Sequence, residues 1–166
     1  MIQHLNLSEM QIFNNLTHKE IEALIKYPAY ISMLAASIDD TLDDAEKKAA
    51  IEFAHTKVYS SNPLLTEFYK EADKVFRKNI EQLENDLPKE KKQRERMIKK
   101  ELSKIEAVVR KLDEEYIIAM HHSMRTFKDH VSEAHHNVLV DFIFPVPIHG
   151  LNDRLRDNLH HVREHI

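Results

Sequence analysis

Cysteine is absent from the 166 residues, and glycine occurs only once. Without cysteine the chain can form no disulfide and offers no thiolate, so any metal must be held by oxygen and nitrogen atoms. The single glycine, the five prolines and the lack of tryptophan leave few of the turns that an all-β chain needs. Glutamate, lysine, leucine and isoleucine are abundant instead, and most of these residues favour helices. The composition therefore predicts an all-α protein.

The sequence shows no pattern typical of a signal peptide or of a membrane span. Its first six residues have neither a basic start nor a long apolar run. The longest apolar stretch, residues 138–148, is too short to cross a bilayer and is interrupted by Asp141, Pro145 and Pro147. A formal net charge of −4 gives no general electrostatic reason to bind nucleic acid. We expect a cytoplasmic protein with no transmembrane segment and no nucleic acid partner.

Helix-start and helix-stop signals divide the first region, residues 1–87, into short helices. Ser8 and Thr17 each begin a capping-box pattern, with Gln11 and Glu20 three residues later. Pro28 ends one helix and suits the first turn of the next, because the first turn does not need its missing N–H group. These signals predict helices at about 9–15, 18–27, 29–36, 43–59 and 64–85.

The second region, residues 88–166, contains a regular apolar seam. Neither glycine nor proline occurs between Pro88 and Pro145, and apolar residues recur there at steps of three and four. The spacing is a heptad pattern with one stutter at 116–124, and it predicts one long helix of five or more heptads, or two helices with a break at 121–123. The seam residues are Ile98, Leu102, Ile105, Val109, Leu112, Tyr116, Met120, Met124, Phe127, Val131, Ala134 and Val138.

An apolar turn containing two prolines, at 142–151, and a terminal helix from Asn152 complete the expected fold. We predict a helical bundle of about six to seven helices, one of them long, whose two regions pack on one core as a single domain. A long helix with a heptad seam also favours self-association, so a homodimer through this helix is expected.

Five carboxylates crowd into eight residues: Asp39, Asp40, Asp43, Asp44 and Glu46. Asp43 and Glu46 fit a capping box that opens the following helix, but Asp39 and Asp40 have no such role. A hard cation such as Ca²⁺ or Mg²⁺ takes several oxygens from one flexible loop. The stretch therefore predicts a site for a divalent cation or a basic partner, although it lacks the order of an EF-hand loop. Helix capping with the remaining carboxylates in water is the simpler alternative.

The order of an apolar helix, an acidic loop, Leu42 and a helix-opening Glu46 resembles the Asp-Gly-x-apolar-x-x-x-Glu stretch of the tellurite-resistance TerB-like helical domains. The resemblance covers about residues 27–59. It implies a non-enzymatic domain whose acidic loop binds a divalent cation, with Asp39 and Glu46 as ligands and Asp43 and Asp44 as neighbouring oxygens. Asp40 stands where the family usually has glycine, so the tight loop of the family does not carry over to this chain.

Two Glu-x-x-His units support a different hypothesis. Paired units of this kind build di-metal centres in four-helix bundles, so a bundle metalloenzyme using Glu52, His55, Glu133 and His136 is the alternative function. A purely structural helical adaptor, which would need no ion, is the third.

Histidine is concentrated late in the chain, where it would suit a transition metal or a solvated helix surface. Nine of the twelve histidines follow residue 120: His121, His122, His130, His135, His136, His149, His160, His161 and His165. Asp129, Glu133 and His136 share one face of the expected long helix, away from its seam. They could hold an ion only with help from another helix or a partner.

Overall fold

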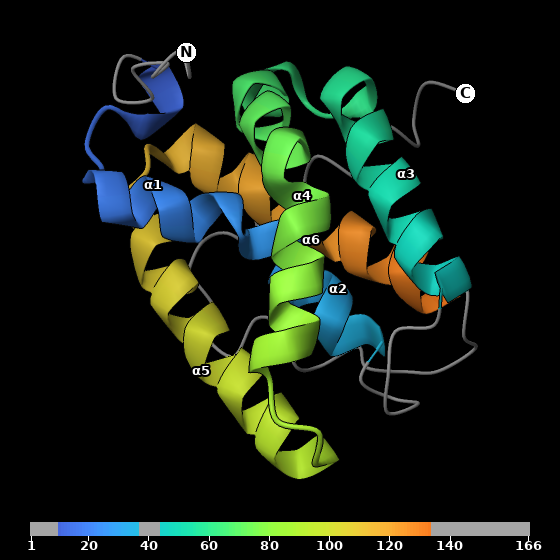
Figure 1. Ribbon diagram of the computed structural model, residues 1–166. Coiled ribbons are helices and arrows are strands. Elements are labelled where there is room, and N and C mark those ends of the chain that lie inside the picture. The colour runs from blue at the N-terminus through green and yellow to red at the C-terminus, as the bar shows by residue number, and fades with distance from the viewer. Residues whose placement is uncertain (1–9, 37–43, 134–166) are drawn as a thin grey trace, which may run out of the picture.

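The structure, a computed structural model, describes residues 10–36 and 44–133 as a bundle of helices (Figure 1). The described residues contain no strand, so the predicted all-α helical bundle is confirmed. The expected proline-containing turn at 142–151 and the terminal helix lie outside the described residues. Six α-helices and two short 3-10 helices are present in the described part: η2 (Gln11–Phe13), α1 (His18–Ile25), α2 (Tyr27–Ala36), α3 (Asp44–Ser60), η4 (Pro63–Leu65), α4 (Thr66–Asp86), α5 (Lys91–Val109) and α6 (Glu114–Glu133).

The first predicted helix is wrong in type, because residues 11–13 form only one 3-10 turn. Asn14 and Asn15 follow this turn, and asparagine favours turns over helix interiors because its side chain competes for backbone hydrogen bonds. Ile12 and Phe13 are nevertheless buried in the core. The sequence therefore predicts these apolar residues correctly, but it predicts the wrong type of helix.

The predicted start of α1 and the separate helix after Pro28 are both confirmed. The Thr17 side chain accepts a hydrogen bond from the backbone N–H of Glu20, and the Glu20 carboxylate accepts one from the backbone N–H of Thr17. Only Lys26 separates α1 from α2, and Pro28 stands in the first turn of α2. Nine of the ten residues of α2 are buried, and this helix packs against α4, α5 and α6.

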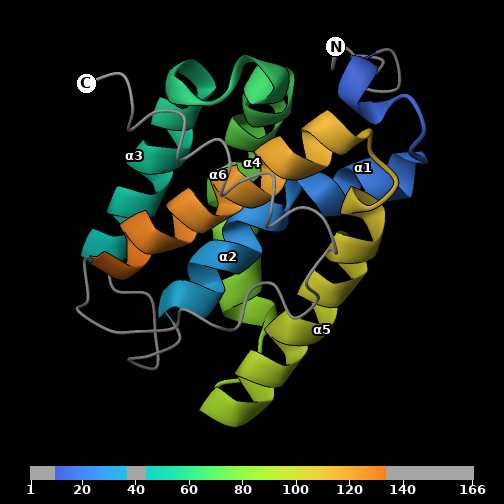
Figure 2. The same cartoon turned by 180° about the vertical axis from the view of Figure 1, so that it is seen from behind.

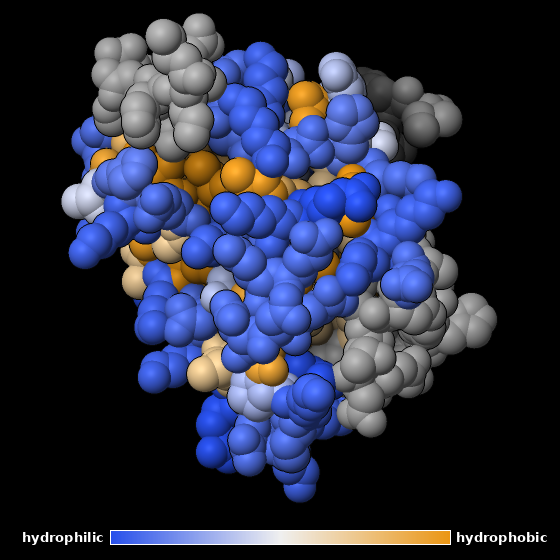
Figure 3. Space-filling view, viewed as in Figure 1, coloured by the Kyte–Doolittle hydropathy of each residue, from blue (hydrophilic) through white to orange (hydrophobic). Residues whose placement is uncertain are grey.

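Helices α3 and α4 lie side by side and are joined by a short connection that falls between the predicted helices 43–59 and 64–85 (Figures 1 and 2). The Asn62 side chain accepts a hydrogen bond from the N–H of Leu64 over 3.0 Å, which starts the short η4 helix at Pro63. At the other end of the pair, Lys47 of α3 lies 2.7 Å from a carboxylate oxygen of Glu84 of α4. Figure 3 shows mostly hydrophilic side chains on the face that α4 occupies, with smaller apolar areas beside it.

The single long helix is wrong, because the chain turns between Val109, where α5 ends, and Glu114, where α6 begins. Two tight hydrogen bonds end α5, from the N–H of Lys111 to the Val108 carbonyl and from the N–H of Leu112 to the Val109 carbonyl. Such i to i−3 bonds tighten the last turn of a helix and stop it from continuing. The alternative break at 121–123 is also wrong, because these residues lie inside α6.

The apolar seam survives the turn, since every seam residue from Ile98 to Val131 is buried. Apolar spacing therefore located the inward face of both helices correctly, but it did not reveal that there are two. The buried seam also changes the expectation of a dimer. Because these side chains fill the core of one chain, they leave no apolar stripe on α5 and α6 for a second copy.

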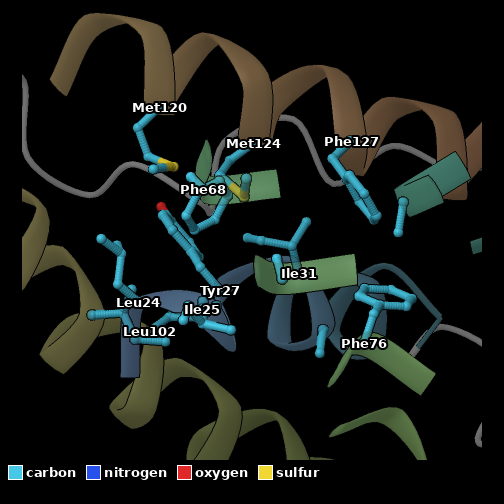
Figure 4. Packing of buried hydrophobic residues seen from close by; sticks show 14 of the residues in the cluster. Leu24, Ile25, Tyr27, Ile31, Phe68, Phe76, Leu102, Met120, Met124 and Phe127 are labelled. Atoms are coloured by element: carbon cyan, nitrogen blue, oxygen red, sulfur yellow. The ribbon is translucent and has the colours of Figure 1, made fainter. Parts of the chain in front are cut away.

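The core brings buried residues of both regions into one hydrophobic cluster. In Figure 4, Met120, Met124 and Phe127 of α6 point toward Tyr27 and Ile31 of α2. The ring of Phe127 lies 5.1 Å from that of Phe53 and 5.9 Å from that of Phe76 between centroids, which joins α6 to α3 and α4. Among the described helices, none is long and apolar enough to cross a membrane.

The half-buried carboxylate of Glu20 joins the start of α1 to the turn between α5 and α6. Glu20 accepts hydrogen bonds from the backbone N–H and the hydroxyl of Thr17, and also from the ammonium of Lys111 in the turn between α5 and α6. The hydrogen bond from Lys111, followed by those from Thr17, lowers the pKa of Glu20 from 4.5 to about 2. A group whose pKa is lower in the folded state stabilises the fold at pH values above its unfolded pKa.

We therefore predict that Glu20→Gln changes the pH dependence of stability. The wild type should lose stability relative to this variant as the pH falls from about 4.5 to about 2, because the folded carboxylate keeps its charge while the unfolded one is protonated. Urea unfolding at pH 6, 4, 3 and 2.5 measures the difference. Glu22→Gln removes the same charge from α1 without touching Thr17 or Lys111 and serves as the control. An equal stability difference between wild type and Glu20→Gln at all four pH values would contradict the prediction.

Candidate functional site

The predicted cation site lies mostly outside the described residues. Asp39, Asp40 and Asp43 belong to residues 37–43, which link the end of α2 to the start of α3. Asp44 is the first residue of α3, and its side chain is exposed. Glu46 lies in the first turn of α3, and its side chain is not among those described. The start of α3 thus agrees with the predicted helix to within one residue, and the convergence of the five carboxylates stays a prediction.

The alternative di-metal centre is wrong for the first of its two units. Glu52 and His55 lie on the outer side of α3, where their side chains are 68% and 62% exposed. The Nδ1 atom of His55 lies 2.8 Å from a carboxylate oxygen of Asp73 on α4, so its partner is not Glu52. A bundle centre needs ligands that project inward from facing helices. The sequence pattern did not reveal the direction of this unit, because it borders the buried stripe of α3.

The second unit and the late histidines are only partly described. Glu133 is the last residue of α6, and neither its side chain nor His136 is among the described parts. Asp129 of the expected trio is exposed and lies 3.5 Å from Lys128 through its carboxylate. Among the side chains that the structure describes, no three His, Asp or Glu residues are grouped so that they could hold a metal ion.

The core contains a polar cluster that joins three helices. Glu106 of α5 accepts a hydrogen bond from the hydroxyl of Tyr27 on α2, and its other carboxylate oxygen lies 2.9 Å from Nε2 of His121 on α6. Tyr27 is fully buried, and the side chains of Glu106 and His121 are only 14% and 11% exposed. Buried polar groups must find such partners, because water is no longer available to them.

A second polar contact joins α4 to α6. The hydroxyl groups of Tyr69 and Ser123 are 2.6 Å apart and buried.

In Figure 4 the hydroxyl of Tyr27 points toward Met120, among apolar side chains of α6 and α4. Burial raises the pKa of Tyr27 well above 10, and the negative charge of Glu106 acts in the same direction. Burial also raises the pKa of Tyr69. Tyr27 is therefore protonated under ordinary conditions and can donate to the carboxylate.

The cluster was not predicted from the sequence, although a weak signal was present. Glu106 and His121 each follow a seam residue directly, Ile105 and Met120, so they occupy the border of the buried face. Polar residues at such positions usually face water. Their pairing across α5 and α6 depends on the turn at 110–113, which folds the two helices onto one core. The arrangement ties helices together, and its groups are turned toward one another.

Comparison with known proteins does not extend this description. No protein-family model matches the chain, and no similar protein was found among curated proteins or solved structures. The resemblance to TerB-like domains therefore depends on the motif at residues 27–59 alone.

We predict that the polar cluster contributes measurably to stability. Tyr27→Phe leaves a carboxylate oxygen of Glu106 without its donor, which should lower the free energy of unfolding by about 1–3 kcal/mol. Glu106→Gln should also destabilise the protein, and the double variant should lose less than the sum, with a coupling of about 0.5–3 kcal/mol. Urea unfolding at neutral pH measures all three.

Tyr30→Phe is the matched control, because Tyr30 lies on the same helix and is half-buried without a hydrogen bond from its hydroxyl to any described residue. Its effect should add to that of Glu106→Gln without coupling. If Tyr27→Phe were as additive with Glu106→Gln as Tyr30→Phe is, the hydrogen bond would contribute nothing to the fold.

Proposed function

We propose that this chain is a non-enzymatic, cytoplasmic helical domain of the TerB-like kind, in which the acidic segment Asp39–Glu46 binds a divalent cation. The main support is the position of this segment. It joins the end of α2 to the first turn of α3, and it carries five carboxylates within eight residues. Such crowding raises the mutual repulsion of the carboxylates, which a cation relieves. Ca²⁺ and Mg²⁺ are the cations that prefer oxygen ligands of this type.

The helices on either side support the proposal because they hold the ends of the segment in place. α2 is buried almost throughout, and α3 packs against α4 along its length. A segment whose two ends are held by packed helices loses less conformational freedom on binding than a free chain does, which favours affinity. The exposed side chain of Asp44 is accessible to an ion at the start of α3.

Two observations favour binding over catalysis. The polar groups of Tyr27, Glu106 and His121 in the core hydrogen-bond to one another, so their role is to tie the helices together. Glu52 and His55 face outward, which removes one unit from the expected metalloenzyme centre. The homodimer expected through a long helix is not part of the proposal, because the residues that would form it are buried within one chain.

We expect isothermal titration calorimetry to show binding of Ca²⁺ or Mg²⁺ to the wild type. The double variant Asp39→Asn/Glu46→Gln should bind at least about tenfold more weakly, because it removes two negative ligands while keeping their shape. Asp86→Asn/Glu81→Gln changes the same charges on the exposed end of α4 and should bind like the wild type.

The same titrations are also carried out with Mn²⁺ and Zn²⁺. Heat from Zn²⁺ that survives in Asp39→Asn/Glu46→Gln identifies the histidines as a separate site. Equal heats for Ca²⁺ and Mg²⁺ in all three proteins would refute the proposed site. The helix-capping alternative makes a different prediction, namely that the double variant is less stable and that no cation changes the melting temperature of any of the proteins.

A further inference from the structure

Lys57 on α3 has a buried side chain whose charge is not matched by any carboxylate that the structure describes. The residue is only 8% exposed, and the other buried lysine of the described part, Lys128, has Asp129 at 3.5 Å. Lys57 forms no ion pair or hydrogen bond with a described carboxylate. Several other lysines on the same pair of helices are paired, such as Lys47 with Glu84 and Lys70 with Glu67. Among the lysines that the structure describes, Lys57 is therefore the one that combines burial with the lack of a described carboxylate partner.

The ammonium group of Lys57 lies over an aromatic ring. The Nζ atom of Lys57 lies 5.2 Å from the ring centroid of Phe53, one turn earlier on α3. Phe53 itself stacks on His130 of α6, with ring centroids 3.8 Å apart and planes 10° from parallel, and it contacts Phe127. A ring attracts an ammonium group less strongly than a carboxylate does, so it compensates only part of the lost hydration.

The surroundings of Lys57 favour the neutral amine. Burial lowers the pKa of Lys57, whereas the hydrogen bond from Lys70 to Glu67 raises the pKa of Lys70. Only the neutral amine has a lone pair available for attack, and lysines desolvated beside apolar groups are activated in this way. At neutral pH a larger share of Lys57 than of the exposed lysines is thus nucleophilic.

We propose that Lys57 is a nucleophilic amine at which this protein is acylated by a thioester or another activated ester. The lone pair of Nζ attacks the acyl carbon, a C–N bond forms, and the C–S or C–O bond of the donor breaks. The leaving group takes the bonding electrons, and the proton of the amine passes to water. The amide product is neutral, so acylation removes the charge that burial disfavours. The same modification of an exposed lysine has no such driving force.

The first experiment compares lysines within the intact chain. The protein is treated briefly with a limiting amount of sulfosuccinimidyl acetate, an activated acetyl ester, and the acetylated peptides are quantified by mass spectrometry. Lys48 on the same helix is the reference, because its side chain is 76% exposed. The rate of Lys57 relative to Lys48 should be at least about threefold higher at pH 7 than at pH 10, because a lowered pKa increases the neutral fraction of Lys57 most at the lower pH.

This comparison cancels the effect of accessibility, which is the same at both pH values as long as circular dichroism shows the fold to be intact. A relative rate that is unchanged between pH 7 and pH 10 would overturn the proposal. So would the absence of any acetyl group on Lys57 when Lys48 is fully modified. A higher relative rate at pH 7 supports it, even if Lys57 reacts more slowly than Lys48 in absolute terms.

A pair of variants gives an independent readout. Lys57→Met keeps a long flexible side chain and removes the charge, so the melting temperature should rise above that of the wild type. Lys57→Arg keeps a charge that cannot be lost, so the melting temperature should fall. Lys48→Met is the control at an exposed position and should change little. If Lys57→Met were the less stable of the two, the ammonium would be stabilised where it is, and the proposal would fail.

Discussion

The burial of α2 is the constraint on which the rest of this bundle depends. Nine of its ten residues are buried, so the helix has almost no face that can be left to water. A helix that is apolar all round is stable only inside a shell of other helices. Here α4, α5 and α6 supply that shell, together with α1 and α3. These outer helices cover α2 because each is amphipathic and buries one apolar stripe against α2 or its neighbours.

Apolar packing alone would leave the rotation of α2 poorly defined, and the polar cluster resolves this. Tyr27 begins α2, and the hydrogen bond from its hydroxyl to Glu106 favours the observed rotation of the helix. Glu106 also meets His121, so the same carboxylate positions α5 against α6 after the turn at 110–113. Directional hydrogen bonds in a core select one arrangement among several that bury similar area.

The two proposed sites lie at opposite ends of the same helix and differ in their physical basis. The acidic segment precedes α3 and concentrates negative charge, which favours a cation. Lys57 lies near the end of α3 with its positive charge buried against the ring of Phe53, and this burial favours the loss of the charge. Neither depends on the other.

The sequence by itself determined the local features of this protein. Composition specified helices, the Thr17 and Glu20 pattern specified the start of α1, and Pro28 specified the separation of α1 from α2. The seam from Ile98 to Val131 correctly gave the buried residues of two helices. These features depend on residues a few positions apart, so the preferences of the backbone and of side chains one turn apart are enough to predict them.

Only the tertiary structure decided where the seam divides, which polar groups are paired and which charge is buried. The heptad spacing is the same whether the helix continues or turns at 110–113, so the spacing cannot predict the break between α5 and α6. Lys57 is buried because Phe53 packs against α6, a contact between residues more than seventy positions apart. The pairing of Tyr27 with Glu106 spans seventy-nine positions. Such contacts depend on how whole helices pack, and local spacing carries no information about that.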